Sequence, residues 1–218
     1  MGEHRVWAEI DLAAIGANLD LVRRSVPRAV RILVVVKADA YGHGAVPVSR
    51  TALAHGAAML GVGDSSEALE LRNAGIDAPL LILGAIVDGE MEQVINHRIT
   101  PCLHSAKKVR ILAAMADAMG KRLAVHLKID TGMGRLGVMP SAALDVAREI
   151  RSCPALALEG ICTHLSDADS PGDAFTATQL TTFREVVDRI EAETGPIPLK
   201  HAANSGGLLG HSGSHFNL

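Results

Sequence analysis

Apolar and polar positions along the chain follow two alternating patterns. Short runs rich in valine, isoleucine and leucine are apolar on both faces, which predicts buried strands of a parallel sheet. These runs are Arg31–Val36, Met59–Val62, Pro79–Leu83, Ile99–Leu103, Leu123–Ile129, Leu158–Thr163 and Pro198–His201. Between them, apolar residues recur at three- and four-residue steps, which predicts helices. The expected helices are Asp11–Val26, Ser65–Ala74, Asp88–His97, Ser105–Met119, Ser141–Ser152 and Thr176–Glu193.

The order of these elements indicates an α/β fold. Repeated strand–helix units with right-handed crossovers leave two candidates, a doubly wound sheet and a TIM-type (β/α)₈ barrel. No GxGxxG motif follows the first apolar strand, which weakens the dinucleotide-binding version of the doubly wound sheet. We therefore predict the barrel.

The strand count predicts that the barrel is incomplete. Seven apolar strands follow Arg31, and the last residues, Phe216-Asn217-Leu218, resemble the start of an eighth. Arg5–Ile10 alternates apolar and polar residues, so we predict a one-sided strand outside the barrel. The expected organisation is an N-terminal strand in residues 1–10 and a barrel in residues 11–218. Open strand edges favour association, so we expect this chain to associate through them.

Composition narrows the possible partners. The 218 residues fit one domain, and a formal net charge of −3 with 2% aromatic residues argues against nucleic-acid binding. No apolar run reaches the roughly 18 residues that would span a bilayer. Three well-separated cysteines and an N-terminus without an apolar signal core predict a reduced, cytoplasmic location.

The first chemical signal is a lysine at the end of a buried strand. Residues 34–44 read VVVKADAYGHG, which places Lys37 where barrel active sites are built. Desolvation at such a position favours the neutral amine that a Schiff base needs. The following glycines permit a tight loop with free backbone N–H groups. A lysine that extends from the strand end to solvent is the structural alternative.

A second strand leads into a segment rich in charge and glycine. Residues 128–137 read KIDTGMGRLG, and Arg135 can present a planar fork to a carboxylate or an aromatic oxygen. A local Lys128–Asp130 ion pair beside a flexible loop is the alternative interpretation.

The sixth and seventh strands also end in polar residues. His164 follows the sixth, where a satisfied core histidine is the alternative. Residues 201–207 read HAANSGG after the seventh, and this loop is a common phosphate site in barrels. Asn204 and Ser205 equally fit an ordinary helix cap.

All these groups fall at C-terminal strand ends, and so at one rim of the predicted barrel. The histidines show no HxH or HExxH metal pattern, and neither a GxSxG elbow nor a P-loop is present. An amine nucleophile, a phosphate cradle and a ring-sized pocket together point to pyridoxal 5′-phosphate, with no metal.

The motifs resemble those of the alanine racemases of the pyridoxal-phosphate barrel class. The likeness covers essentially the whole chain: AEIDL at residues 8–12 with Asn18, then residues 36–44, 128–137, 163–164 and 201–205. It implies that Lys37 forms a Schiff base with the cofactor and that Tyr41 contacts its phosphate. It makes Arg135 the partner of the pyridine 3′-oxygen and of the substrate carboxylate.

The resemblance also assigns supporting residues. His164 would neighbour the ring, Asn204 and Ser205 would help hold the phosphate, and His201 would lie behind the residues that touch the cofactor. In some members the lysine matching Lys128 is carbamylated and supports the arginine. The implied reaction interconverts L- and D-alanine, supplying D-alanine for peptidoglycan.

Racemisation requires one base on each face of the reacting carbon. In the family the second base is a tyrosine of a C-terminal β-domain, contributed by the partner subunit of a head-to-tail homodimer. The resemblance also implies that the Arg5–Ile10 strand pairs with this β-domain. That domain, and an arginine facing the pyridine nitrogen, are absent from these 218 residues, and Tyr41 is the sole tyrosine. We therefore expect weak or no racemisation from this chain.

Two other functions fit parts of the pattern. The short length favours a single-domain pyridoxal-phosphate binding or carrier protein without racemase activity. The segment 37–44 and the motif around Arg135 favour the racemase. A barrel decarboxylase or aldolase using the same cofactor would need a metal or acidic constellation that the sequence lacks.

Overall fold

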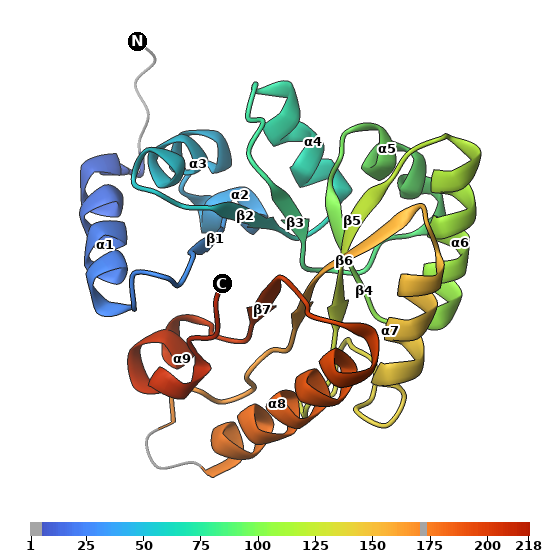
Figure 1. The fold of residues 1–218 in the computed structure, drawn as a ribbon. Coiled ribbons are helices and arrows are strands. Elements are labelled where there is room, and N and C mark those ends of the chain that lie inside the picture. Colours follow the sequence, from blue (N-terminus) through green and yellow to red (C-terminus); the bar gives the residue numbers. More distant parts are fainter. Residues whose placement is uncertain (1–5, 171–173) are drawn as a thin grey trace.

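The computed structural model describes residues 6–170 and 174–218 and shows one sheet of seven parallel strands. Each strand pairs with its neighbours in chain order, and the sheet curls with its helices on the outside (Figure 1). The strands are β1 (Leu33–Val35), β2 (Met59–Val62), β3 (Leu80–Ile82), β4 (Thr100–Leu103), β5 (Leu123–Lys128), β6 (Leu156–Cys162) and β7 (Leu199–His201). Each of the seven predicted apolar strands is present, and the incomplete TIM-type barrel is confirmed.

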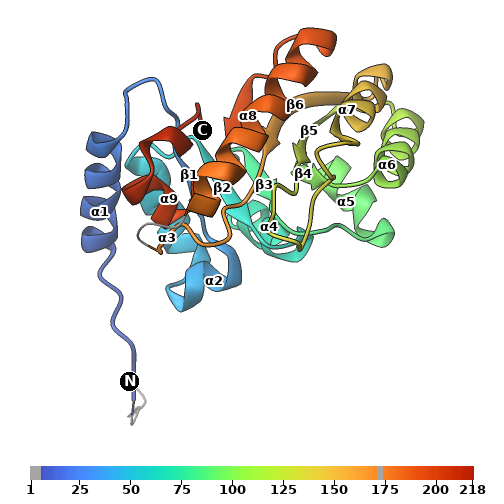
Figure 2. The same cartoon turned by 90° about the horizontal axis from the view of Figure 1, so that it is seen from below.

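Helices connect the strands and cover the outer face of the sheet (Figure 2). They are α1 (Leu12–Ser25), α3 (Ala45–Ala54), α4 (Ser65–Asn73), α5 (Met91–Asn96), α6 (Ala106–Ala118), α7 (Ala143–Ser152), α8 (Ala174–Thr194) and α9 (Ser205–Gly210), with single 3₁₀ turns η1 (Asp88–Glu90) and η2 (Ser212–Ser214). The six predicted helices are all present. Ser105 caps α6, because its side chain accepts a hydrogen bond from the Lys108 N–H.

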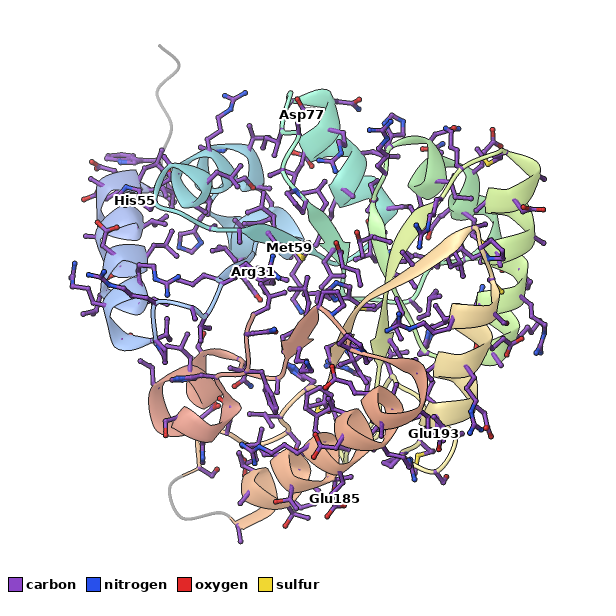
Figure 3. All side chains as sticks on the ribbon, in the orientation of Figure 1. Arg31, His55, Met59, Asp77, Glu185 and Glu193 are labelled. Carbon is purple, nitrogen blue, oxygen red and sulfur yellow. The ribbon has the colours of Figure 1, made fainter. Side chains whose placement is uncertain are left out.

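Two apolar layers hold these elements together. The larger lies between the strands and the helices, and Phe183 and Leu112 are among its fully buried side chains. The smaller fills the inside of the curled sheet: Met59, Leu81, Cys102, Cys162, Leu199 and Leu218. Figure 3 shows Met59 near the middle of the molecule, whereas Asp77 and Glu185 lie at its periphery. Alternation between the two layers explains why the strands are apolar on both faces.

The end of the chain lies in the gap between β7 and β1 (Figure 1). The Asn217 carbonyl accepts a hydrogen bond from the Arg31 N–H at 3.1 Å, and the Leu218 N–H donates to the Lys200 carbonyl at 3.1 Å. Residues 216–218 thus bond to both edges of the gap, although they do not form a strand. This is the behaviour expected of the start of an eighth strand.

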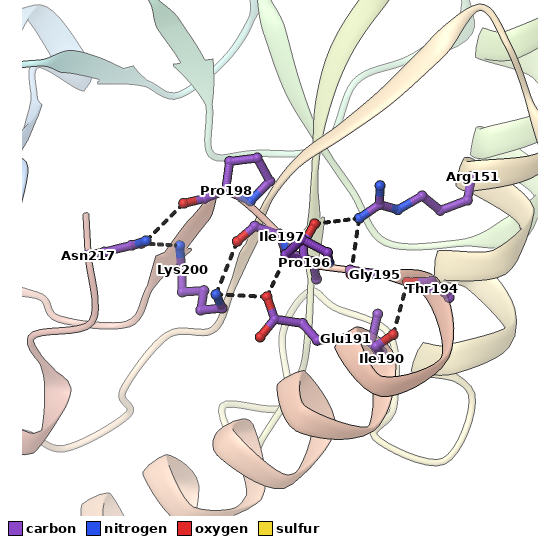
Figure 4. A network of polar contacts seen from close by, with 10 residues as sticks. All are labelled: Arg151, Ile190, Glu191, Thr194, Gly195, Pro196, Ile197, Pro198, Lys200 and Asn217. Atoms are coloured by element: carbon purple, nitrogen blue, oxygen red, sulfur yellow. Dashed lines mark hydrogen bonds and ion pairs between the residues drawn. The ribbon is translucent and has the colours of Figure 1, made fainter.

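Side chains anchor β7 beside this gap (Figure 4). The Lys200 ammonium lies 2.8 Å from the Glu191 carboxylate of α8, which also accepts the Ile197 N–H at 2.7 Å. The Asn217 side chain accepts the Lys200 N–H at 2.6 Å and donates to the Pro198 carbonyl at 2.8 Å. The half-buried Lys200–Glu191 ion pair therefore fixes β7 to α8, and the Asn217 side chain fixes it to the end of the chain.

Residues 6–10 of the expected N-terminal strand do not pair as a strand with any other described residue. Arg5 lies outside the described residues, and Val6–Asp11 have no regular secondary structure. Val6 and Trp7 are exposed, and the segment leads away from the sheet (Figure 2). A strand needs a partner for its N–H and C=O groups, and none of the described residues pairs with this segment.

The segment between β1 and β2 also differs from expectation. Helix α3 was not predicted, and Lys37–Gly42 forms a short helical turn, α2, where a tight loop was expected. None of the helices in the part of the chain that the structure describes is long and apolar enough to cross a bilayer.

Candidate active site

A cavity of about 630 Å³ lies at the C-terminal ends of the strands. Its volume is within the range of small-molecule sites. All eight residues singled out by the sequence line it: Lys37, Tyr41, Lys128, Arg135, His164, His201, Asn204 and Ser205. The structure therefore brings together residues that are up to 168 positions apart (205 − 37) in the sequence.

Lys37 enters the cavity from a left-handed turn. Ala38, Asp39, Ala40 and Tyr41 have φ values of 50°, 53°, 52° and 56°, a conformation that is rare for residues with a Cβ atom. The Asp39 side chain closes the turn by accepting the Ala45 N–H at 2.6 Å. Tyr41 is 61% exposed and lies at the edge of the cavity. The turn thus directs Lys37 and Tyr41 to one site.

The segment after β5 places one cation inside the barrel and another at its rim. Lys128 is 8% exposed, whereas Arg135 is exposed and makes no hydrogen bond or ion pair to the described residues. Asp130 does not pair with Lys128. It accepts the N–H groups of Gly132 and Gly134, each at 3.0 Å, and so shapes the loop that carries Arg135.

Gln179 of α8, which sequence reasoning missed, holds the loop that carries His164. Its amide is fully buried, donates to the His164 carbonyl at 3.2 Å, and accepts the Ser166 N–H at 3.0 Å. It also donates to the Thr131 hydroxyl at 3.3 Å. A buried glutamine within an amphipathic helix was the available signal, since such a side chain must find partners.

His164 faces the cavity as a neutral imidazole at physiological pH. Burial lowers its pKa to about 4, with further lowering by the positive charges of Lys128, Arg135 and Lys37. Burial, followed by His126 and Lys128, also holds the pKa of His201 well below its usual value. Both rings are therefore available as neutral hydrogen-bonding groups.

The loop after β7 begins α9 at the cavity. Asn204 caps this helix by accepting the Gly207 N–H at 2.8 Å, so the cap interpretation of Asn204 is correct. Ser205 is exposed beside it and lines the cavity. The first backbone N–H groups of a helix lack partners within the helix, so an anion is favoured beside the start of α9.

The charge of the site is one-sided. Among the described residues, the cavity lining includes Lys37, Lys128 and Arg135 but no carboxylate. A cavity lined by cations and low-dielectric walls attracts anions. Gly63 and Gly84 also line it, and a Cβ on Gly84 would lie 2.3 Å from the Gly63 carbonyl oxygen. The glycine at position 84 thus lets the ends of β2 and β3 approach each other closely, while the cationic lining suits an anionic molecule.

Comparison with known families places the chain in one of them. A family model described as "Alanine racemase, N-terminal domain" matches residues 10–218. The chain belongs to this family.

Curated relatives extend the alanine racemase likeness over the whole chain. Alanine racemase of Methanococcus maripaludis is 38% identical over 219 residues, covering 100% of this chain and 59% of the relative. Alanine racemase of Syntrophobacter fumaroxidans is 41% identical over 213 residues, covering 97% and 56%. The chain thus spans a little over half the length of these alanine racemases.

Solved alanine racemases have the same fold. The enzyme from D-cycloserine-producing Streptomyces lavendulae superposes with a TM-score of 0.96 at 34% identity, covering 100% of this chain and 58% of that one. Alanine racemase of Bacillus anthracis with bound L-Ala-P gives 0.93 at 32% identity, covering 100% and 56%. The barrel architecture of this chain is therefore that of the N-terminal part of an alanine racemase.

Proposed function

We propose that this chain is the cofactor-binding barrel of an alanine racemase and that Lys37 binds pyridoxal 5′-phosphate covalently. The observation that carries the proposal is a cavity that Lys37 lines together with Arg135, His164 and the start of α9, with no carboxylate among its described lining residues. A primary amine can bond to an aldehyde, while a guanidinium and backbone N–H groups can bind anionic oxygens. The donor set therefore fits this cofactor.

Each lining residue is assigned a different part of the cofactor or of the substrate to bind. Ser205, the N–H groups at the start of α9 and Tyr41 would hold the phosphate, with Asn204 fixing the helix start. Arg135 would bind the pyridine 3′-oxygen and the substrate carboxylate through its planar fork. His164, which is neutral, would lie beside the pyridine ring. Lys128 and His201 would not touch the cofactor but would support the residues that do.

When bound, the cofactor supplies an electron sink that acidifies the Cα–H of an attached amino acid. Lys37 Nζ would then remove and return a proton at one face of Cα. Inversion needs a second base at the opposite face. Tyr41, the sole tyrosine of the chain, is committed to the phosphate in this arrangement. We therefore propose that residues 1–218 racemise alanine weakly or not at all.

We attribute the second base to a C-terminal domain of a partner subunit in the longer protein. On this proposal the longer protein is a cytoplasmic homodimer that supplies D-alanine for peptidoglycan. The support is the family membership and the names of the relatives, which are alanine racemases more than one and a half times as long.

Incubation with L-alanine and pyridoxal phosphate in deuterated water tests the proposal. We expect deuterium at Cα without appreciable D-alanine, and no deuterium with a Lys37→Ala variant. Absence of exchange in the unaltered chain would instead support the carrier interpretation. D-alanine formation at about 1–1,000 per second would contradict the proposed impairment.

A further inference from the structure

The left-handed turn after Lys37 needs support from outside itself. Ala38, Asp39, Ala40 and Tyr41 are ordinary L-residues for which positive φ brings Cβ close to the following carbonyl oxygen. Isolated chains of such residues prefer the right-handed or extended regions. A turn of this kind persists only where surrounding contacts determine it. The first peptide of the turn is therefore expected to bond to groups outside the turn.

The ladder between β1 and β2 stops just before this turn. Its pairs are Leu33–Met59, Val34–Leu60 and Val35–Gly61, and the Val36 N–H donates to the Gly61 carbonyl at 2.8 Å. If the ladder continued for two more residues on each strand, its next hydrogen bond, or rung, would join Ala38 and Gly63. That rung is not made: the Ala38 N–H bonds to a side chain instead, and the Gly63 carbonyl accepts the Gly84 N–H at 3.1 Å.

The Glu67 carboxylate of α4 bridges the missing rung. Its Oε1 accepts the Ala38 N–H at 2.8 Å, and its Oε2 accepts the Gly63 N–H at 2.7 Å. Both oxygens are thus used, one at each strand end. Among the described residues Glu67 forms no ion pair, so these two N–H groups account for its charge-assisted bonds.

The position of Glu67 in its helix points to a role beyond capping. Asp64 is the N-cap and accepts the N–H groups of Ser66 and Glu67, which makes Glu67 the third helical residue. In a capping box, a glutamate at this position bonds back to the N-cap N–H. Here the carboxylate extends past the cap to Gly63 and across to Ala38. The helix terminus favours its negative charge.

We propose that Glu67 is a positioning residue for Lys37. Its carboxylate fixes the peptide that follows Lys37 to the end of β2, and so keeps the turn left-handed and the amine directed into the cavity. This inference rests on the proposed function for the role of Lys37. Glu67 itself does not line the cavity. It would act on Lys37 only through the backbone of the turn.

The carboxylate can be tested with three variants of the 218-residue chain. Glu67→Ala removes both acceptors, whereas Glu67→Gln keeps one acceptor oxygen and faces the other N–H with an amide NH₂. Glu70→Ala is the matched control, because Glu70 is exposed on the same helix. The amide of Leu127, which lies in β5 and is fully buried, reports whether each variant is folded.

The first measurement is nuclear magnetic resonance of the turn, which requires no cofactor. In Glu67→Ala we expect the Ala38 and Gly63 amides to exchange at least about tenfold faster, as for loss of a charge-assisted hydrogen bond. The ¹³C shifts of residues 38–41 should lose their positive-φ signature. Glu67→Gln should be intermediate, and Glu70→Ala unchanged. Retention of the positive-φ shifts in a folded Glu67→Ala chain would overturn the inference.

The second measurement is the rate at which pyridoxal phosphate forms a borohydride-reducible adduct on Lys37. We expect about tenfold slower adduct formation in Glu67→Ala, with partial rescue in Glu67→Gln. An unchanged rate despite an altered turn would contradict a positioning role. If the unaltered chain forms no adduct on Lys37, the proposed function fails, whereas the resonance measurement still decides whether Glu67 holds the turn.

Discussion

The Nε2 atom of His201 lies 2.8 Å from the Nδ1 atom of His126, inside the curled sheet. His126 comes from β5 and is fully buried, and its other ring nitrogen lies 3.5 Å from the Glu159 carboxylate. The ladder between β5 and β6 shifts register beside His126, which pairs with Gly160. A Cβ on Gly160 would lie only 2.5 Å from the His126 ring. Gly160 therefore provides the space that brings His126 to His201.

Gly160→Ala should consequently be destabilising. The added methyl group cannot be accommodated without displacing His126, and such overpacking costs about 1–3 kcal/mol of the free energy of unfolding. Denaturant unfolding measures this cost. Gly89→Ala is the matched control, because a Cβ there meets nothing within 4 Å, and it should change stability by less than about 0.5 kcal/mol. Equal effects of the two variants would contradict the packing argument.

The low pKa of His164 predicts that acid destabilises the fold. Its folded-state pKa is about 4, below the unfolded value near 6.5, so the unfolded chain binds more protons between these pH values. The contribution of His164 is complete above pH 6.5 and is lost as the pH falls toward 4. After a discount for solvent screening of the partly exposed ring, we expect about 1–2 kcal/mol.

Urea unfolding at pH 7 and pH 4.5 checks this expectation. The pKa values of His104 and His201 are lowered as well, chiefly by burial, so they act in the same direction. His164→Gln should therefore reduce the loss of stability at low pH but not abolish it. An identical pH dependence in His164→Gln and the unaltered chain would exclude a contribution from His164.

Arg135→Lys should weaken binding of pyridoxal phosphate. Lysine keeps the charge but lacks the planar fork, and Arg135 has no partner among the described residues that its loss would disrupt. We expect about tenfold weaker binding, the factor for loss of one charge-assisted hydrogen bond. Arg122→Lys, a change at an exposed arginine outside the cavity, should bind normally in the same titration.

The sequence predicts most of the barrel because its strands are buried on both faces. The continuous apolar run Met59–Val62 matches β2 exactly as assigned, and the other strand boundaries differ by one to a few residues. Barrel geometry then places strand ends at one rim, which is why Lys37, Arg135 and His164 could be expected together. Their chemical roles remain predictions.

Other features depend on contacts that the sequence does not display. The left-handed turn consists of residues without a preference for positive φ, and its support by Glu67 joins positions 29 residues apart. Helix α3 was not predicted because glycine and proline, here Gly44 and Pro47 at its start, are typical of loops. Arg5–Ile10 has the alternation of a strand, but its described residues, 6–10, pair with no other described residue. The pattern of apolar and polar residues in one segment does not show whether a second strand is present to pair with it.

The central claim is that Lys37 bonds covalently to pyridoxal phosphate in this cavity. The most direct measurement is borohydride reduction of the chain after saturation with pyridoxal phosphate, followed by peptide mass mapping. We predict one reduced adduct, located on Lys37 and absent from Lys37→Ala. A chain that stays unlabelled, or a label on Lys128 or a surface lysine in place of Lys37, would contradict the account.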